Sequence, residues 1–278
     1  KTLVFFHGNA GNLNNRIYKL NKINQLNVPE LTNTIINNLN IRLFGTFSIF
    51  IGDKLYKNYL IYDDFIKINN AIVDNDFFKN SFNFFGAKSK LFDHGEVTDE
   101  TNWKLLTETL LEGYHIKSLH KNTFYPYGLN NINIVETDGP NSRVIFPFKR
   151  IEKIREIDPI KRKLNGVATS VFHLFPNASV SVLSKHTSLT IMEPLTPSSV
   201  KTISYLVFND KEDGEGTTLE DAKRDAQFVN ESGQSEDREA ARKIQETVTT
   251  AANTHLTFGF FEKAIVNFHK HLTLKIKK

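Results

Sequence analysis

The order of the expected elements predicts an α+β fold, a curved antiparallel sheet closed by long C-terminal helices. Six β-rich segments follow one another between residues 131 and 209, and only short turns separate most of them. Strands joined by short loops pair antiparallel. Two helical patterns, Ser235–Thr250 and Phe260–Leu272, then end the chain. The alternation of strand and helix that marks a parallel sheet is absent after residue 40.

The six strands share β-branched and aromatic residues and are bounded by turn-forming residues. We expect them at 131–139, 143–150, 168–176, 179–185, 186–194 and 200–208. Asp138-Gly139-Pro140 and Pro176-Asn177 supply two of the turns. The charged stretch 152–163 predicts a short helix, and residues 210–234 begin polar and acidic and become helical.

The first hundred residues give weaker patterns. Residues 1–27 predict a strand, a Gly/Asn-rich turn and a short helix, and Ile41–Gly52 predicts a β-rich segment. Residues 55–95 are expected to form short helices and loops. A helix is then expected over Asp99–Leu111, with Asp99 or Thr101 as its N-terminal cap.

Composition limits the possible functions. The chain has 278 residues, 40% of them hydrophobic, which suits one large domain with a substantial core. Its net charge of +4 is too mild to predict a nucleic-acid partner, and no apolar run reaches the roughly 20 residues of a membrane span. Because it begins with Lys1, we expect a fragment. We expect a cytoplasmic protein with no membrane partner.

The chain has no cysteine, so any bound metal must be held by His, Asp or Glu. His115 and His120 lie five positions apart, and such residues do not share a helix face. If both bind one metal, the helix must end or loosen between them. Two neutral imidazoles suit Fe, Zn, Cu or Ni, and a carboxylate third ligand would complete the facial triad of non-haem Fe(II) oxygenases. The alternative is a histidine pair that only packs or lies at the surface.

The segment Asn102–His120, "NWKLLTETLLEGYHIKSLH", resembles the mononuclear-iron segment of Rieske-type aromatic-ring-hydroxylating oxygenases, in their large (α) subunit. All elements of the family's pattern are present at its spacing: Asn102-Trp103-Lys104, Glu108, Glu112, Tyr114, His115 and His120. Further similar segments are "TFYPYG" at 123–128, "HLFPN" at 173–177 and "MEPLTP" at 192–197. The resemblance covers about residues 28–272.

The resemblance implies that His115, His120 and Asp237 are the iron ligands. Asp237 matches the family's third ligand because Gln245 follows it by eight residues, although the adjacent Glu236 is a competing acid. Glu112 occupies the position of the carboxylate that links the iron site to the Rieske cluster of a neighbouring subunit. We expect it also to orient an iron-bound histidine.

The implied fold is the helix-grip (START/Bet v1-like) fold, with residues 28–278 as the mononuclear-iron catalytic domain. The implied activity is O2-dependent mono- or dioxygenation of an apolar or aromatic small molecule at Fe(II). Electrons would come from NAD(P)H through a ferredoxin or reductase and a Rieske [2Fe–2S] cluster, in a homotrimer. The alternative is a catalytically dead helix-grip module that binds a ligand.

The chain departs from the family at its N-terminal end. A Rieske cluster needs two Cys and two His, so this chain cannot bind one, and we expect the cluster from a missing domain or a partner. Residues 1–27 instead resemble the first strand and oxyanion loop of serine α/β-hydrolases. No Gly-x-Ser-x-Gly nucleophile motif occurs, so we predict no hydrolase activity and interpret 1–27 as a remnant or foreign segment.

Overall fold

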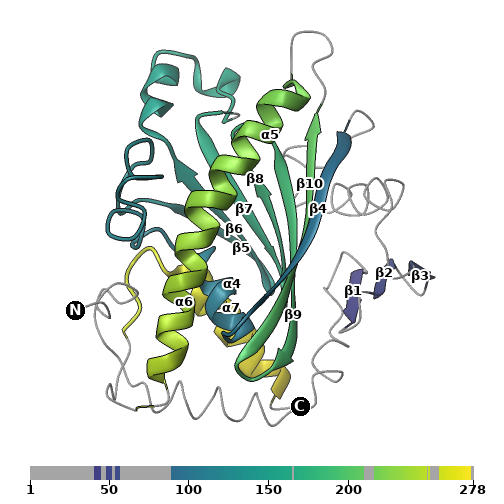
Figure 1. The fold of residues 1–278 in the computed structure, drawn as a ribbon. Helices are drawn as coiled ribbons and strands as arrows, with labels where there is room; N and C mark the ends of the chain where they lie inside the picture. Colours follow the sequence, from purple (N-terminus) through teal and green to yellow (C-terminus); the bar gives the residue numbers. More distant parts are fainter. Residues whose placement is uncertain are drawn as a thin grey trace.

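The computed structural model describes residues 41–44, 48–51, 54–56, 89–164, 166–209, 216–248, 250 and 257–276. Its main feature is a seven-stranded sheet in the order β4-β10-β9-β8-β7-β6-β5, with helices across one face (Figure 1). The strands are β4 (Ser89–Asp99), β5 (Ile134–Asp138), β6 (Asn141–Pro147), β7 (Ala168–Leu174), β8 (Ala178–Val182), β9 (Thr187–Thr196) and β10 (Ser199–Asn209). The helices are α4 (Trp103–Thr109), α5 (Leu219–Phe228), α6 (Ser235–Val248) and α7 (Lys263–Ile276).

The antiparallel sheet predicted from the sequence is confirmed. Each of the six expected strands is present, and every neighbouring pair in the sheet is antiparallel. The register of β10 shifts at two places, Leu206/Val207 against β4 and Ser199/Val200 against β9. Such irregularities bend a strand and increase its twist, which helps this sheet to curve around the helices.

The expectation of short helices and loops over 55–95 is wrong where the structure describes it. Lys54–Tyr56 is strand β3, and 89–95 begin the long edge strand β4, which pairs with β10 along its whole length. Asp93, His94 and Gly95 are poor strand formers, so the local pattern is not β-like. Pairing with the partner strand outweighs that local preference. Residues 57–88 lie outside the described residues.

The start of α4 also differs from the expectation. Asp99 still belongs to β4, and Asn102 caps the helix by accepting a hydrogen bond from the Lys104 N–H at 3.0 Å. The Thr101 hydroxyl instead donates to the Ala241 carbonyl on α6 at 3.2 Å. The Asn102 N–H donates to Oε1 of Gln245 at 3.0 Å. These two contacts join the start of α4 to the middle of α6.

A long helical segment lies across the sheet (Figure 1). It consists of α5, the π-helical turn η3 (Val229–Gln234) and α6, which follow one another without a break. The last helix, α7, buries Ala264, Ile265, Phe268 and Leu272, the stripe expected of an amphipathic helix. Phe268 meets the ring of Trp103 edge-on, with 5.7 Å between centroids. Both rings belong to one hydrophobic core to which α4, α6, α7 and the sheet contribute.

Three smaller outcomes complete the fold. The charged stretch 152–163 forms part of two 3₁₀ helices, η1 (Lys149–Ile154) and η2 (Pro159–Lys161), in place of one helix. The β-rich segment at 41–52 is confirmed as β1 (Ile41–Phe44) and β2 (Ser48–Ile51), which pair antiparallel. Residues 1–40 lie outside the described residues, so the domain division at residues 27 and 28 stays a prediction.

Candidate metal centre

The two histidines predicted as ligands follow α4 in a series of turns. The helix ends at Thr109, before both of them, so their spacing is not restricted by helical geometry. The His115 carbonyl accepts from the Leu119 N–H at 2.7 Å, and the His120 carbonyl accepts from the Tyr125 N–H at 3.0 Å. These turns bring the rings within 4.9 Å of each other, centroid to centroid. Residues five positions apart could not share one metal on a continuous helix, and the end of α4 before His115 removes that restriction.

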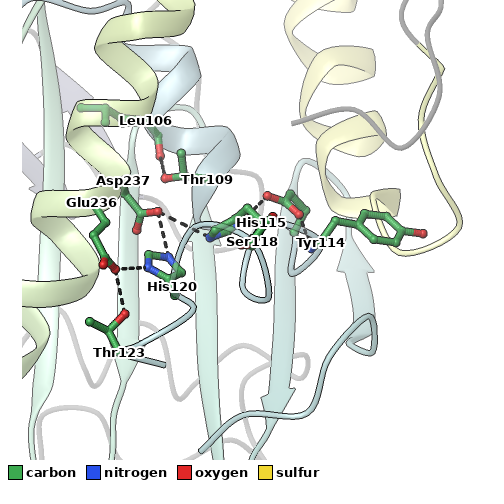
Figure 2. A network of polar contacts seen from close by, with 10 residues as sticks. Leu106, Thr109, Tyr114, His115, Ser118, His120, Thr123, Glu236 and Asp237 are labelled. Atoms are coloured by element: carbon green, nitrogen blue, oxygen red, sulfur yellow. Dashed lines mark hydrogen bonds and ion pairs between the residues drawn. The ribbon is translucent and has the colours of Figure 1, made fainter. Parts of the chain in front are cut away.

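Asp237, in the first turn of α6, lies beside both imidazoles (Figure 2). Its Oδ1 is 3.1 Å from Nε2 of His120 and 3.5 Å from Nε2 of His115. One ligand atom from each of the three residues lies within 4.8 Å of the others. The structure therefore brings together the three residues that the sequence singled out, from segments more than 110 positions apart.

Each imidazole uses its other nitrogen to bind a second carboxylate. Nδ1 of His115 contacts Oε1 of Glu112, whose Oε2 accepts the Tyr114 N–H. Nδ1 of His120 is 2.7 Å from Oε2 of Glu236 (Figure 2). A carboxylate on Nδ1 favours a proton there and leaves the Nε2 lone pair directed at Asp237.

Glu236 therefore does not take the place of Asp237, although the sequence left it as a competing ligand. It lies on the far side of the His120 ring from Asp237, and the Thr123 hydroxyl donates to the same oxygen at 2.7 Å. Sequence reasoning missed this role of Glu236 and Thr123. The sequence does show that Glu236 and Asp237 are adjacent. Spacing along the chain does not show which nitrogen of His120 each acid approaches.

The site is buried and strongly acidic. Burial lowers the pKa of His115, but the charge and hydrogen bond of Glu112, with a further contribution from Asp237, raise it to about 9. Without a metal, this imidazole therefore holds a proton at neutral pH. A divalent cation would replace that proton and compensate the same carboxylates.

The residues fit a metal ion. Oδ1 of Asp237 is buried and has no hydrogen-bond partner among the described residues, which is costly unless another group binds it. Ligand atoms that lie about 2.1 Å from one metal and at right angles are about 3 Å apart, similar to the separations from Asp237. Two imidazoles and one carboxylate suit Fe(II) with open positions. This fit rests on geometry and donor chemistry.

A cavity of about 410 Å³ adjoins the site and includes Glu112, His115, His120 and Asp237 in its lining. Its volume is within the usual range of ligand pockets. Apolar side chains from α4, the turns after it and the α5–η3 segment form one part of the wall: Leu106, Leu110, Ile116, Phe124, Phe228 and Val229. The sheet contributes hydroxyl groups: Thr169, Ser181, Ser188, Thr190 and Thr202. The sheet also contributes apolar side chains, Phe146, Val171 and Met192, so the lining is mainly apolar and these hydroxyl groups are its polar part on the sheet side.

The π-helical turn lines this cavity beside the candidate metal site. A side chain at Gly233 would overlap the ring of Phe124, and that ring packs edge-on against His120 with 4.9 Å between centroids. π-helical turns inside α-helices are frequent at functional sites. Here the turn brings the glycine against Phe124 and is followed directly by Glu236 and Asp237.

The remaining described histidines have structural contacts. His173 is buried, and its Nε2 is 3.1 Å from the Pro176 carbonyl oxygen, while desolvation lowers its pKa to about 4. His186 contacts Asp225 at 2.8 Å, and His269 contacts Glu108 at 2.7 Å. His271 packs near Phe175, and His94 is exposed. His255 lies outside the described residues.

The fold is of the helix-grip type, and two buried histidines and a carboxylate that could hold one metal ion lie beside its cavity. A sequence model of the ring hydroxylating alpha subunit (catalytic domain) family matches residues 91–277, so the chain belongs to that family of oxygenases. Members of that family use non-haem iron together with a Rieske cluster. No curated protein matches the chain.

Solved structures agree on the fold. A quaternary ammonium Rieske monooxygenase is 15% identical, with 86% of this chain and 62% of that chain covered and a TM-score of 0.56. Naphthalene 1,2-dioxygenase from Rhodococcus sp. is 15% identical, with 87% and 67% covered and a TM-score of 0.55. The monooxygenase CntA bound to the inhibitor MMV12 is 14% identical, with 69% and 50% covered and a TM-score of 0.53. The chain spans about half to two thirds of the length of these chains.

Hydropathy adds one finding about the helices. Among the residues that the structure describes, no helix combines the length and the apolar character needed to cross a membrane.

Proposed function

We propose that this chain is the catalytic domain of a Rieske-type oxygenase and that His115, His120 and Asp237 hold Fe(II). The observation that carries the proposal is the buried Oδ1 of Asp237, which lacks a hydrogen-bond partner among the described residues and faces the Nε2 atoms of both histidines. Iron bound there would supply the activation of O2. Glu112 and Glu236 would hold the imidazoles in the orientation that directs Nε2 at the metal.

The cavity next to these residues is the proposed site for the organic substrate. Its helix side would pack against an apolar or aromatic small molecule and exclude water, and the hydroxyl groups of the sheet would orient it. The proposed reaction is O2-dependent mono- or dioxygenation. The solved neighbours that match in fold include a monooxygenase of quaternary ammonium compounds and a naphthalene dioxygenase bound to indole.

Electrons would enter beside Glu112. This carboxylate contacts His115 directly, and each of its oxygens retains lone pairs for a further hydrogen bond. We propose that it bridges to a histidine of a Rieske [2Fe–2S] cluster carried by a missing domain or by a partner, since the chain has no cysteine. The electron source would be NAD(P)H through a reductase or ferredoxin. One solved neighbour is described as showing inter-subunit electron transfer, and the proposed assembly here is a homotrimer.

Iron content tests the metal assignment. The chain, purified anaerobically and supplied with Fe(II), should bind about one iron, and Asp237→Ala should reduce the bound iron to background. Glu246→Ala is the matched control, because Glu246 lies exposed on the same helix and should leave iron binding unchanged. Absence of stoichiometric iron in the wild-type chain, or equal iron in Asp237→Ala, would overturn the proposal.

The alternative is a helix-grip module that binds a small molecule without catalysis, which the cavity would also permit. Product formation discriminates the two. The chain with a reductase alone should be inactive, and the addition of a Rieske partner protein should give NADH-dependent product from O2. Product from the chain and reductase alone would contradict the proposed electron route. Ligand binding without iron binding would favour the alternative.

A further inference from the structure

One charged side chain of the cavity wall, Arg150, contacts neither an acid nor a histidine among the described residues. The five charged lining residues of the cavity are Glu112, Arg150, Asp225, Asp237 and Arg238. Arg238 pairs with Asp99 at 3.4 Å. Each of the three acids contacts a histidine: Glu112 contacts His115, Asp225 contacts His186, and Asp237 contacts both site histidines. Within the described part of the chain, the contacts of Arg150 are to neutral groups only.

Arg150 is nevertheless held in place. Its Nε donates to the Gly166 carbonyl, its Nη2 donates to the Ser184 hydroxyl at 2.8 Å, and its guanidinium lies 4.7 Å from the centre of the Phe148 ring. These bonds use two of the five guanidinium N–H donors, so three remain for a ligand. A fixed fork of donors is suited to bind a carboxylate through two parallel hydrogen bonds.

The position of Arg150 separates it from α4. Its partner Ser184 lies in the turn before β9, whereas Met192 lies further along β9 and accepts a hydrogen bond at its sulfur from Thr107 of α4 at 3.2 Å. Thr187 and Met192 both belong to β9, and five residues of extended strand cover roughly 17 Å. A ligand that reached Arg150 would thus extend away from α4 along the hydroxyl-bearing wall of the sheet.

That wall also contains an unsatisfied polar group. Oγ1 of Thr202 is buried, lines the cavity and has no hydrogen-bond partner among the described residues. An aromatic hydrocarbon would leave this buried hydroxyl without a partner and would make no use of the donors of Arg150, which water solvates at this exposed position. A molecule with polar groups would satisfy them.

We infer that the substrate is an amphipathic organic anion whose carboxylate binds Arg150 at the exposed edge of the cavity. The inference rests on the proposed function in that it takes this cavity as the substrate site. Asp225 also lines the cavity, from helix α5, but it already accepts from the Lys185 N–H at 2.9 Å and contacts His186. At the position of Arg150, the cavity therefore favours a negative end group over a positive one.

Calorimetric binding of three matched probes to the metal-free chain tests the inference: 4-phenylbutyrate, 4-phenylbutan-1-ol and 4-phenylbutylammonium. Removal of the metal ensures that the carboxylate is not bound by iron. The carboxylate should bind roughly fivefold more tightly than the alcohol, because a charge-assisted bond at an exposed position is worth about 1 kcal/mol. Arg150→Gln should abolish that preference, and Arg150→Lys should restore part of it.

Lys149→Gln is the control, since Lys149 precedes Arg150 but donates to the Pro126 carbonyl outside the cavity lining. It should keep the carboxylate preference. The inference is overturned if the alcohol or the ammonium binds as tightly as the carboxylate, if Lys149→Gln loses the preference too, if Arg150→Gln keeps it, or if no probe binds at millimolar concentration. A carboxylate preference in a chain that fails to bind iron would refute the proposed function alone.

Discussion

The two histidines of the proposed metal site contact carboxylates in contrasting ways. On the His115 side, Glu112 lies three residues away on the same turn, and its side chain is 3% exposed. On the His120 side, Glu236 comes from another helix, 116 positions along the chain, and its side chain is 31% exposed. Glu112 is fixed by the Tyr114 backbone, whereas Glu236 is fixed by the Thr123 hydroxyl.

The difference indicates which contact should contribute more to metal binding. A buried charge has no water to replace a lost partner, so its interactions are strong and its removal is costly. A partly exposed carboxylate is screened by water and contributes less. The contact between Glu112 and His115 should therefore contribute most to metal affinity, and the contact between Glu236 and His120 should contribute less.

Removal of Glu112 should have the largest effect. Glu112→Ala frees the His115 ring and leaves the Tyr114 N–H without its acceptor, and we expect affinity for Zn(II) or Fe(II) to fall about 100-fold. Competition with a chromogenic chelator measures this. Glu108→Gln, one turn earlier on α4 and paired with His269, should change affinity little. Equal losses in the two variants would show that helix damage explains the effect.

The second prediction concerns the stability of the metal-free chain. The pKa of His115 is about 9 in the folded chain against an ordinary 6.5, so the folded state binds a proton that the unfolded state releases in this range. The stabilisation due to His115 should be fully present below pH 6.5 and should fall by about 3 kcal/mol as pH rises through 9. Urea unfolding between pH 6 and 9.5 measures this fall in the free energy of unfolding. It should be much smaller in Glu112→Gln than in the wild type, because only Asp237 still raises the pKa of His115 there.

Lys104 must be separated from this effect because it acts in the opposite direction. Burial lowers its pKa to about 7 despite the nearby Glu108, so its contribution to stability increases as pH rises from 7 towards 10.5. Lys104 is present in the wild type and in every variant, so its contribution cancels when the unfolding free energies of two proteins are subtracted at each pH. Glu236→Gln should keep the wild-type pH dependence due to His115. If the free energy of unfolding of Glu236→Gln did not depend on pH, Glu236 would matter as much as Glu112 for the protonation of His115, against this prediction.

Removal of Glu236 should have a smaller effect on the metal. Glu236→Ala should lower Zn(II) or Fe(II) affinity about tenfold, at the lower end of the range for groups that orient a ligand. The same chelator competition applies, with Glu239→Ala as the control on an exposed position of α6. A loss as large as that of Glu112→Ala would refute the ranking by burial.

The smallest effect is expected at Thr123. Thr123→Val removes one hydroxyl donor from Glu236 and keeps the shape of the side chain, and we expect a two- to fivefold loss of metal affinity, about 1 kcal/mol or less. In the Glu236→Ala background the same substitution should have no further effect, because the two residues act in series. Additive losses in the double variant would show that Thr123 does not act through Glu236.

The sequence predicted most of the fold because its signals are local. The six strands from 131 to 209 carry β-forming residues between turn residues, and the last two helices carry an apolar stripe. It did not predict β4, because Asp93-His94-Gly95 lacks a strand pattern and is held by pairing with β10. It also misplaced the cap of α4, since the tertiary contacts of Thr101 and Asn102 with α6 decide where the helix begins.

The candidate site divides in the same way. The spacing of Glu112, His115 and His120 and the position of Asp237 before Gln245 were readable in the chain, because a family motif preserves short-range order. Only the tertiary structure decided that Asp237 faces both Nε2 atoms while Glu236 binds the other nitrogen of His120. It also decided that Arg150 reaches the cavity wall. Such contacts depend on how helices and strands pack in space, which spacing along the chain does not determine.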